Sequence, residues 1–178
     1  IFTAITGLAY PLAITGVAQM AIPFQANGSQ VIKDGKTVGS SLIGQNFSGD
    51  QYFWPRPSVT ADVPYNAAAS TGSNLGTTSA ALKDRVATEI KRLNDAGIAG
   101  SIPADGATAS GSGLDPDISP AFAAVQVIRI AQARGLPEEK VNQVLNQHTQ
   151  IRLLGFIGEP CVNVLEINLA LDGLSAGQ

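Results

Sequence analysis

The sequence predicts an α/β protein in which one N-terminal transmembrane helix, residues 1–24, is followed by a compact soluble domain, residues 25–178, with a small sheet and about four helices. Three patterns support this fold class. The chain opens on an apolar run, and Lys33 is its first charged residue. Short apolar pairs alternating with Asn-Gly and Asp-Gly then indicate strands, and apolar residues at helical spacing follow in the second half. A chain of 178 residues is long enough to bury one core.

The opening 24 residues, IFTAITGLAYPLAITGVAQMAIPF, form the predicted membrane anchor. At about 1.5 Å per residue, a helix of this length crosses a hydrocarbon core of about 30 Å. A cleaved signal peptide is the alternative, but it needs a small-x-small site that Ala18-Gln19-Met20 does not supply. Gly7 and Gly16 let neighbouring helices approach closely, which makes them candidate partner contacts.

Residues 25–47 alternate short apolar pairs with turn dipeptides, of which Asp34-Gly35 is typical of a hairpin. We therefore expect a small sheet directly after the anchor. Residues 52–79 are rich in Pro, Gly, Ser and Ala and have no apolar period, so they predict a long loop. The aromatic residues in this loop indicate that it is ordered, because large rings seek burial.

Four later stretches have helical character. Residues 79–94 place apolar side chains at helical spacing with charged side chains opposite. Ser119 and the proline after it supply an N-cap and a first-turn proline for a second helix, which Gly135 ends. A third helix begins after Pro137 with two glutamates at its positively polarised end, and residues 162–172 form the last.

The composition narrows the classes of function. The net charge is −3 and only 14% of residues are charged, so no basic surface for nucleic acid is expected. Cys161 and His148 are the only residues of their types, which excludes an intrachain disulfide and a His-rich metal site. No Gly-x-Ser-x-Gly motif accompanies His148, and residues 34–37 lack the first glycine of a P-loop. We expect neither a metal nor catalytic residues.

The segment TASGSGLDPDISPAF, residues 108–122, is the main candidate for a binding site. A dinucleotide fingerprint fails because Pro116 stands where a glycine is needed. A calcium loop fails because Pro120 and Gln126 replace its glycine and glutamate. Two interpretations stay open: a loop-to-helix junction capped by Ser119, or a nucleotide contact made by backbone N–H groups. The nucleotide candidate comprises Ser110, Gly111, Ser112, Gly113 and Leu114.

Aromatic residues of the long loop are candidate contacts with a partner protein. Phe53, Trp54 and Tyr65 serve either such a contact or the packing of the core. Arg56 lies among them, and it either stacks on a ring or holds a carboxylate across an interface. We favour internal stacking for Arg56, and we retain it with the three aromatics among the candidate partner contacts.

Several longer strings point to a known family. They are GSSLIGQNFSGDQYFWPRPS, YNAAASTGSNLG, TASGSGLDPDISPAFAAVQVIRIAQARGL and GEPCVNVLEINLALD. Together they make a chain that resembles the C subunit of the Kdp potassium-transporting ATPase of bacteria, from about Gly7 to Leu171. The resemblance implies a single-pass protein of the bacterial inner membrane. The implied partners are a channel-like potassium-translocating subunit, a P-type ATPase subunit and a small single-span subunit.

The same resemblance implies an accessory role, without catalysis by this chain alone. One role attached to the family is that of a catalytic chaperone that raises the ATPase subunit's affinity for ATP, so ATP is expected only through the complex and no cofactor is expected to bind tightly. The family also implies a soluble domain on the outer, periplasmic face, where it cannot touch ATP inside the cell. We favour the outward domain, with a role in stabilising or regulating the assembly, and keep the ATP-binding chaperone as the alternative.

Overall fold

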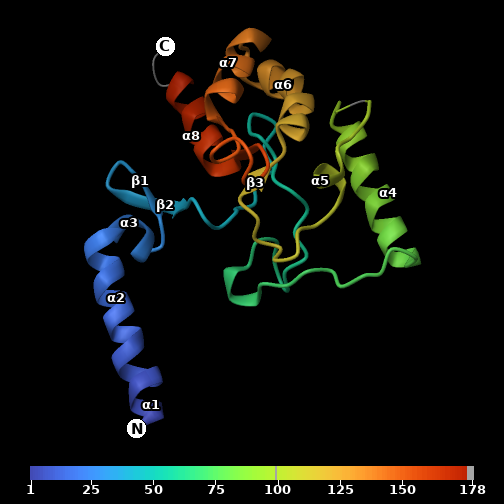
Figure 1. Ribbon diagram of the computed structural model, residues 1–178. Coiled ribbons are helices and arrows are strands. Elements are labelled where there is room, and N and C mark those ends of the chain that lie inside the picture. Colours follow the sequence, from blue (N-terminus) through green and yellow to red (C-terminus); the bar gives the residue numbers. More distant parts are fainter. Residues whose placement is uncertain (99, 176–178) are drawn as a thin grey trace. The chain divides into compact units, whose positions relative to one another are not determined.

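The structure is a computed structural model that describes residues 1–98 and 100–175 (Figure 1). Its contacts divide the chain into two units, Ile1–Leu42 and Ile43–Gln178. The first unit contains the apolar opening and a hairpin. The second contains a further set of helices, a second sheet and all the candidate site residues except the two anchor glycines.

The apolar opening is helical from Phe2 to Ala21, and this helix is long and apolar enough to cross a membrane. It consists of α1 (Phe2–Ala4), the π-helical turn η1 (Ile5–Ala9) and α2 (Tyr10–Ala21), none of which has a buried side chain. Ile22 leaves helical geometry, as residues before proline tend to do. The helix therefore ends at Ala21 instead of residue 24, and a separate turn, α3 (Pro23–Ala26), follows.

The predicted hairpin is confirmed. Strand β1 (Gln30–Lys33) pairs antiparallel with β2 (Lys36–Ser40), with a register shift between Val31 and Ile32. Asp34 and Gly35 form the turn and have φ of 51° and 74°. Positive φ at both central residues is the geometry that matches the twist of two hairpin strands, and Asp-Gly adopts it readily.

The second unit contains the four predicted longer helices and two shorter helical turns. These elements are the turns η2 (Ala67–Ala69) and α5 (Ala104–Ala107) and the helices α4 (Ala80–Asp95), α6 (Pro120–Arg134), α7 (Glu138–His148) and α8 (Val164–Ser175). Figure 1 shows α6, α7 and α8 gathered at one end of the unit, where α7 packs against both of the others. Their buried side chains form the core, and the largest of these include Phe122, Ile130, Val141, Ile167 and Leu171.

The boundaries of α6 follow the predicted local signals. The Ser119 hydroxyl accepts a hydrogen bond from the N–H of Phe122 at 3.0 Å, so Ser119 is the N-cap. Gly135 adopts the left-handed conformation with φ of 64° at the other end. The junction interpretation of the 108–122 segment is therefore confirmed at its helical end.

A second sheet was not predicted. It has the order β3-β5-β4, with β3 (Asp117–Ile118) and β4 (Thr149–Gln150) both antiparallel to β5 (Cys161–Asn163). Strands of two or three residues are too short to show an alternating pattern. The last helix was also placed too early, because residues 162 and 163 belong to β5 and α8 begins at Val164.

In the segment Asp50–Trp54, the backbone of Phe53 and Trp54 is bound by two buried amide side chains instead of a neighbouring strand. Asn168 of α8 accepts from the Phe53 N–H at 2.8 Å and donates to the Phe53 carbonyl at 3.0 Å. Gln126 of α6 does the same for Trp54, at 2.8 Å and 3.2 Å. Both amides are essentially inaccessible to solvent. They satisfy the polar groups of a backbone segment that lies in the core.

Two arginines of α6 fix the same segment. Arg129 donates to the carbonyls of Asp50 and Tyr52 at 2.6 Å and 2.9 Å. Arg134 donates to the Gln51 carbonyl at 2.6 Å and pairs with Asp172 of α8 at 2.9 Å. The buried helices α6 and α8 are thus joined through the loop segment that precedes Trp54.

Replacing Gln126 with leucine tests this arrangement. Gln126→Leu keeps a side chain of similar size but leaves the Trp54 N–H and carbonyl without partners in the core, so we expect a loss of about 2–4 kcal/mol in the free energy of unfolding. Gln132→Leu on the exposed side of α6 is the matched control. Denaturant unfolding of the full chain in detergent measures both, and equal stabilities of the two variants would contradict the role assigned to Gln126.

Candidate functional site

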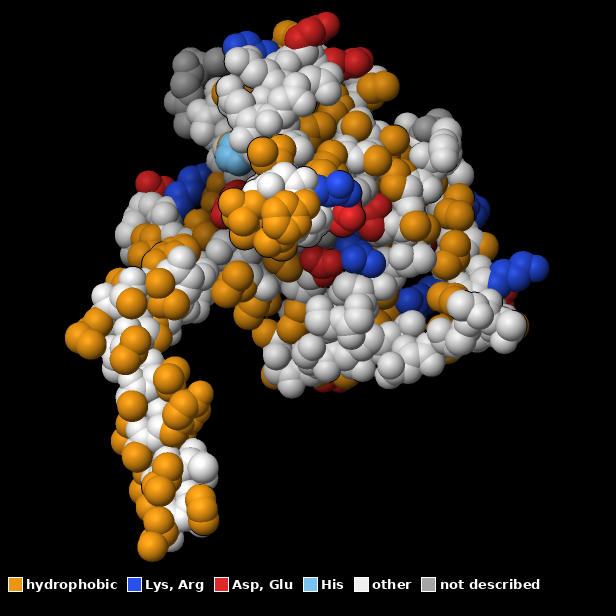
Figure 2. Space-filling view, in the orientation of Figure 1, with side chains coloured by type: hydrophobic (Ala, Val, Ile, Leu, Met, Phe, Trp, Pro, Cys, Tyr) orange, Lys and Arg blue, Asp and Glu red, His pale blue; other side chains and the backbone are white. Residues whose placement is uncertain are grey.

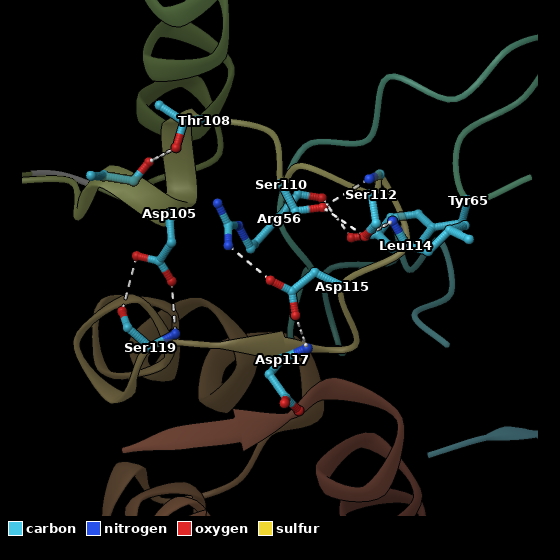
Figure 3. A network of polar contacts seen from close by, with 12 residues as sticks. Arg56, Tyr65, Asp105, Thr108, Ser110, Ser112, Leu114, Asp115, Asp117 and Ser119 are labelled. Atoms are coloured by element: carbon cyan, nitrogen blue, oxygen red, sulfur yellow. Dashed lines mark hydrogen bonds and ion pairs between the residues drawn. The ribbon is translucent and has the colours of Figure 1, made fainter. Parts of the chain in front are cut away.

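The candidate nucleotide segment, Ser110–Leu114, lies in a network of polar contacts among loops (Figure 3). The Ser110 hydroxyl accepts from the Gly113 N–H at 2.9 Å, and the Ser112 hydroxyl accepts from the Leu114 N–H at 3.1 Å. Backbone N–H groups are the donors with which such a loop would hold a phosphate. Two of those donors are already used by the segment's own serines.

The carbonyl groups of this segment join it to other loops. The Ser112 carbonyl accepts from the Thr71 N–H and the Ser70 hydroxyl, both at 3.0 Å. The Leu114 carbonyl accepts from the Gly44 N–H at 2.8 Å. The segment therefore connects residues 44 and 70–71, which are distant from it in the sequence.

Gly113 is required by the conformation of the segment. Its φ is 68°, and a Cβ atom there would lie 2.8 Å from both the Thr60 methyl carbon and the Thr71 carbonyl oxygen. Its own carbonyl accepts from the Ser58 hydroxyl at 2.7 Å. Gly111 is different, because its φ is ordinary and a Cβ atom would meet no other atom within 4 Å. The exposed part of the candidate site is therefore Gly111 and Ser112.

Arg56 forms an ion pair inside the chain. Its guanidinium lies 2.8 Å from the Asp115 carboxylate, and both side chains are about three-quarters buried. The Tyr65 hydroxyl donates to the Arg56 carbonyl at 2.7 Å. Burial raises the pKa of Tyr65, and the nearby Asp115 carboxylate adds to this effect. The predicted stacking of Arg56 on a ring was therefore wrong: Arg56 pairs with a carboxylate, and the Trp54 and Tyr52 rings contact other arginines.

The Trp54 ring lies against two guanidinium groups. Arg129 is 3.9 Å and Arg92 is 4.5 Å from the ring centroid. Burial lowers the pKa of Arg129 to about 10, so its guanidinium is still charged at neutral pH. Phe53 is 0% and Trp54 is 5% exposed. The core-packing alternative therefore holds for these two aromatics, and neither presents a surface to a partner, whereas Tyr65 and Arg56 are partly accessible.

A groove of about 410 Å³ borders this network, and four of its ten lining residues are acidic. Its carboxylates belong to Asp105, Asp115, Asp117 and Glu159, and Cys161 lies among them. Burial and the neighbouring acids raise the pKa of both the Asp117 carboxyl and the Cys161 thiol. A protonated thiol is a weak nucleophile. Among the described residues, no group of three His, Cys, Asp or Glu side chains is arranged to hold a metal ion.

Asp105 stabilises the start of α6 from outside the helix. Its carboxylate accepts from the Ser119 N–H at 2.7 Å and from the Ser119 hydroxyl at 3.0 Å. Figure 3 shows this pair beside the Arg56–Asp115 ion pair. The hydroxyl thus donates to Asp105 and accepts from Phe122, which explains how one serine fixes both the loop and the helix.

The sequence reasoning missed the residues that organise the site. Gln126 and Asn168 are polar residues within apolar helical faces, and this pattern was a usable signal. Arg92 and Arg129 gave no local signal, because their ring partner lies far away in the sequence. Gly7 and Gly16 lie in the helical opening, where an added Cβ would meet no atom outside the nearby helix backbone, and their helix–helix contact stays a prediction.

The fold and the site together define a small α/β domain carried by a candidate membrane-spanning helix, in which the conspicuous loop residues are used for internal packing. Comparisons with known proteins identify the family. A family model described as the K+-transporting ATPase, c chain, matches residues 1–173. The potassium-transporting ATPase KdpC subunit of Variovorax paradoxus is 56% identical, over 100% of this chain and 93% of the relative.

Two other relatives carry the same description. The KdpC subunit of Polaromonas naphthalenivorans is 55% identical over 98% of this chain and 90% of its own length. That of Citrifermentans bemidjiense is 57% identical over 97% of this chain and 91% of its own length. The chain belongs to the KdpC family of potassium-transporting ATPase subunits, which confirms the resemblance noted in the sequence.

The raised pKa of Asp117 gives a pH-dependent prediction. The folded protein holds this proton more tightly than the unfolded chain does, so Asp117 reduces stability as the pH rises from the ordinary value of 3.8 through its native pKa. Asp117→Asn keeps an oxygen for the Asn163 amide and removes the charge. We expect the variant to be more stable than the parent at pH 7, by a margin that shrinks on acidification.

Chemical denaturation of the full chain across this pH range measures the difference. Asp84→Asn on the exposed face of α4 is the control and should show no such trend. A variant of residue 117 that is less stable than the parent at pH 7 would contradict the prediction.

Proposed function

We propose that this chain is an accessory, non-catalytic subunit of a bacterial ATP-driven potassium uptake complex, and that it stabilises or regulates the assembly through protein contacts. The proposed partners are the channel-like potassium-translocating subunit, the P-type ATPase subunit and the small single-span subunit. Its membership of the KdpC family supports the complex, and the candidate membrane helix supports a place in the bilayer. Gly7 and Gly16 remain candidates for close helix approach in that assembly.

One observation favours assembly over nucleotide binding. The N–H groups of Gly113 and Leu114 donate to the hydroxyls of Ser110 and Ser112. These two donors of the segment are therefore already engaged and do not face a phosphate. Holding ATP there would require breaking those hydrogen bonds. The chaperone alternative would have to rely on the exposed Gly111 and on the hydroxyl of Ser112.

We further propose that the second unit faces the outside of the inner membrane. Its low charge and its long loops rich in small residues suit a domain held against a partner. An outward domain also removes the physical route to ATP inside the cell, in agreement with a role in assembly.

Gly111→Ala separates the two functions in the complete complex. The added methyl fits the fold but would block close approach of a phosphate to the backbone. We expect the KM for ATP to be unchanged, whereas omitting the whole chain should lower the yield of assembled complex. ATP hydrolysis and the yield after detergent extraction are the measurements. A KM raised by about tenfold, with normal yield, would instead establish the chaperone.

The orientation is tested with a cysteine at an exposed loop position. Thr77→Cys, made in a Cys161→Ala background, should react with a membrane-impermeant maleimide in right-side-out vesicles. The control is the same reaction after the vesicles are permeabilised. Labelling only after permeabilisation would place the second unit inside the cell and remove the argument against direct ATP contact.

A further inference from the structure

An apolar hairpin projects from the second unit between β4 and β5. Five of its side chains are exposed to unusual degrees: Ile151 84%, Leu153 66%, Leu154 76%, Phe156 74% and Ile157 48%. In the orientation of Figure 2, an apolar cluster protrudes near the middle of this unit, with acidic and basic side chains beside it. Single exposed apolar residues are common, but a contiguous cluster marks an interaction surface.

The hairpin is built as a preformed shape. Leu153 and Ile157 exchange two backbone hydrogen bonds, of 2.9 Å and 3.0 Å. At its base, Arg152 and Glu159 form an ion pair at 2.7 Å. These contacts hold the apolar side chains of the tip outward without help from the core, and a preformed element loses little conformational entropy when it binds.

The residue at the tip is unfavourable for the turn itself. Leu154 has φ of 54° and Gly155 has φ of 82°, both in the left-handed region. Glycine and asparagine adopt this conformation readily, whereas a bulky side chain such as leucine does so at a cost. A leucine that is both strained and 76% exposed contributes little to folding. An exposed leucine at this strained position is better explained by contact with a second molecule.

The charge of the side chains beside the hairpin discriminates between three possible binding partners: an anionic lipid surface, a second copy of the chain and a different protein. Four carboxylates line the groove next to the hairpin base, and two of them are ion-paired, Asp115 with Arg56 and Glu159 with Arg152. Asp105 and Asp117 form no ion pair with a cation among the described residues, so the rim carries a net negative charge. An anionic lipid surface would be repelled by this rim, and a second copy of the chain would oppose acid to acid. A protein surface with an apolar pocket flanked by Lys or Arg fits both features.

We propose that the hairpin Ile151–Ile157 is the docking element by which this chain binds another subunit of the potassium-transporting ATPase, inserting Leu154 and Phe156 into an apolar pocket with a basic rim. This rests on the proposed function, in which the chain works through protein contacts. It assigns that contact to a short segment outside the loops that the sequence singled out.

Photo-crosslinking in the assembled complex identifies the occupant directly. A benzophenone side chain is placed at position 154, and the same group at position 128 on the exposed side of α6 serves as control. We expect an adduct of position 154 with another subunit of the ATPase and a much weaker one from position 128. Adducts only with lipid, only with a second copy of the chain, or equally from both positions would each overturn the proposal.

Leu154→Asn separates docking from folding. Asparagine suits the left-handed turn, so the melting temperature of the full chain should stay the same or rise, while the polar side chain removes the apolar contact. We expect recovery of the chain with the complex to fall by about tenfold, and Ile128→Asn to leave it unchanged. Undiminished recovery of Leu154→Asn would overturn the docking proposal.

The proposed function is judged by a different result. If omitting the whole chain lowers the yield of complex but Leu154→Asn does not, the accessory function stands and the docking proposal fails. If omitting the whole chain changes neither yield nor activity, the accessory function itself fails, whatever the hairpin binds.

Discussion

The second unit depends on how the backbone of Phe53 and Trp54 is accommodated in the core. A buried peptide group without a hydrogen-bond partner costs about 1–3 kcal/mol, and none of the strands that the structure describes pairs with this segment. Asn168 and Gln126 each offer one donor and one acceptor on a single planar amide, which matches the N–H and carbonyl of one residue. The two amides, which belong to helices, therefore make the backbone hydrogen bonds that a neighbouring strand would otherwise make. Once this condition is met, Phe53 can be fully buried between α6 and α8.

The positions of the other loops depend on the fixed backbone of Phe53 and Trp54. Trp54 presents its ring to Arg129 of α6 and Arg92 of α4, and this contact links α4 to the helical core. Two residues later, Arg56 reaches Asp115, which ties the long loop to the segment that precedes α6. The loop region is thus ordered by a chain of specific polar contacts together with the burial of Phe53 and Trp54. Such contacts are directional, so they define one arrangement of loops that have little regular structure.

Residues that look functional in the sequence and residues that are exposed in the structure are different sets in this protein. The aromatic and glycine-rich loops look functional in the sequence, yet Phe53, Trp54 and Gly113 are committed to the interior of the domain. The hairpin at residues 151–157 is the reverse, since its apolar side chains are exposed and its turn is strained. The exposed hairpin is therefore the surface to which we assign a partner contact, whereas these loop residues pack inside the domain.

The sequence by itself determined the features that depend on neighbouring residues. The apolar opening helix, the Asp34-Gly35 hairpin turn, the Ser119 cap and the Gly135 stop each rest on interactions within a few residues, so local patterns predicted them. Strings spread along most of the chain also identified the family. Only the tertiary structure decided what lies far apart in sequence: the strands of two or three residues, the amides that bind residues 53 and 54, and the partner of Arg56. Apart from the β4–β5 pairing, which joins residues 11 to 13 apart, these contacts span roughly 45 to 115 residues. No local periodicity encodes which distant group a buried polar side chain will meet.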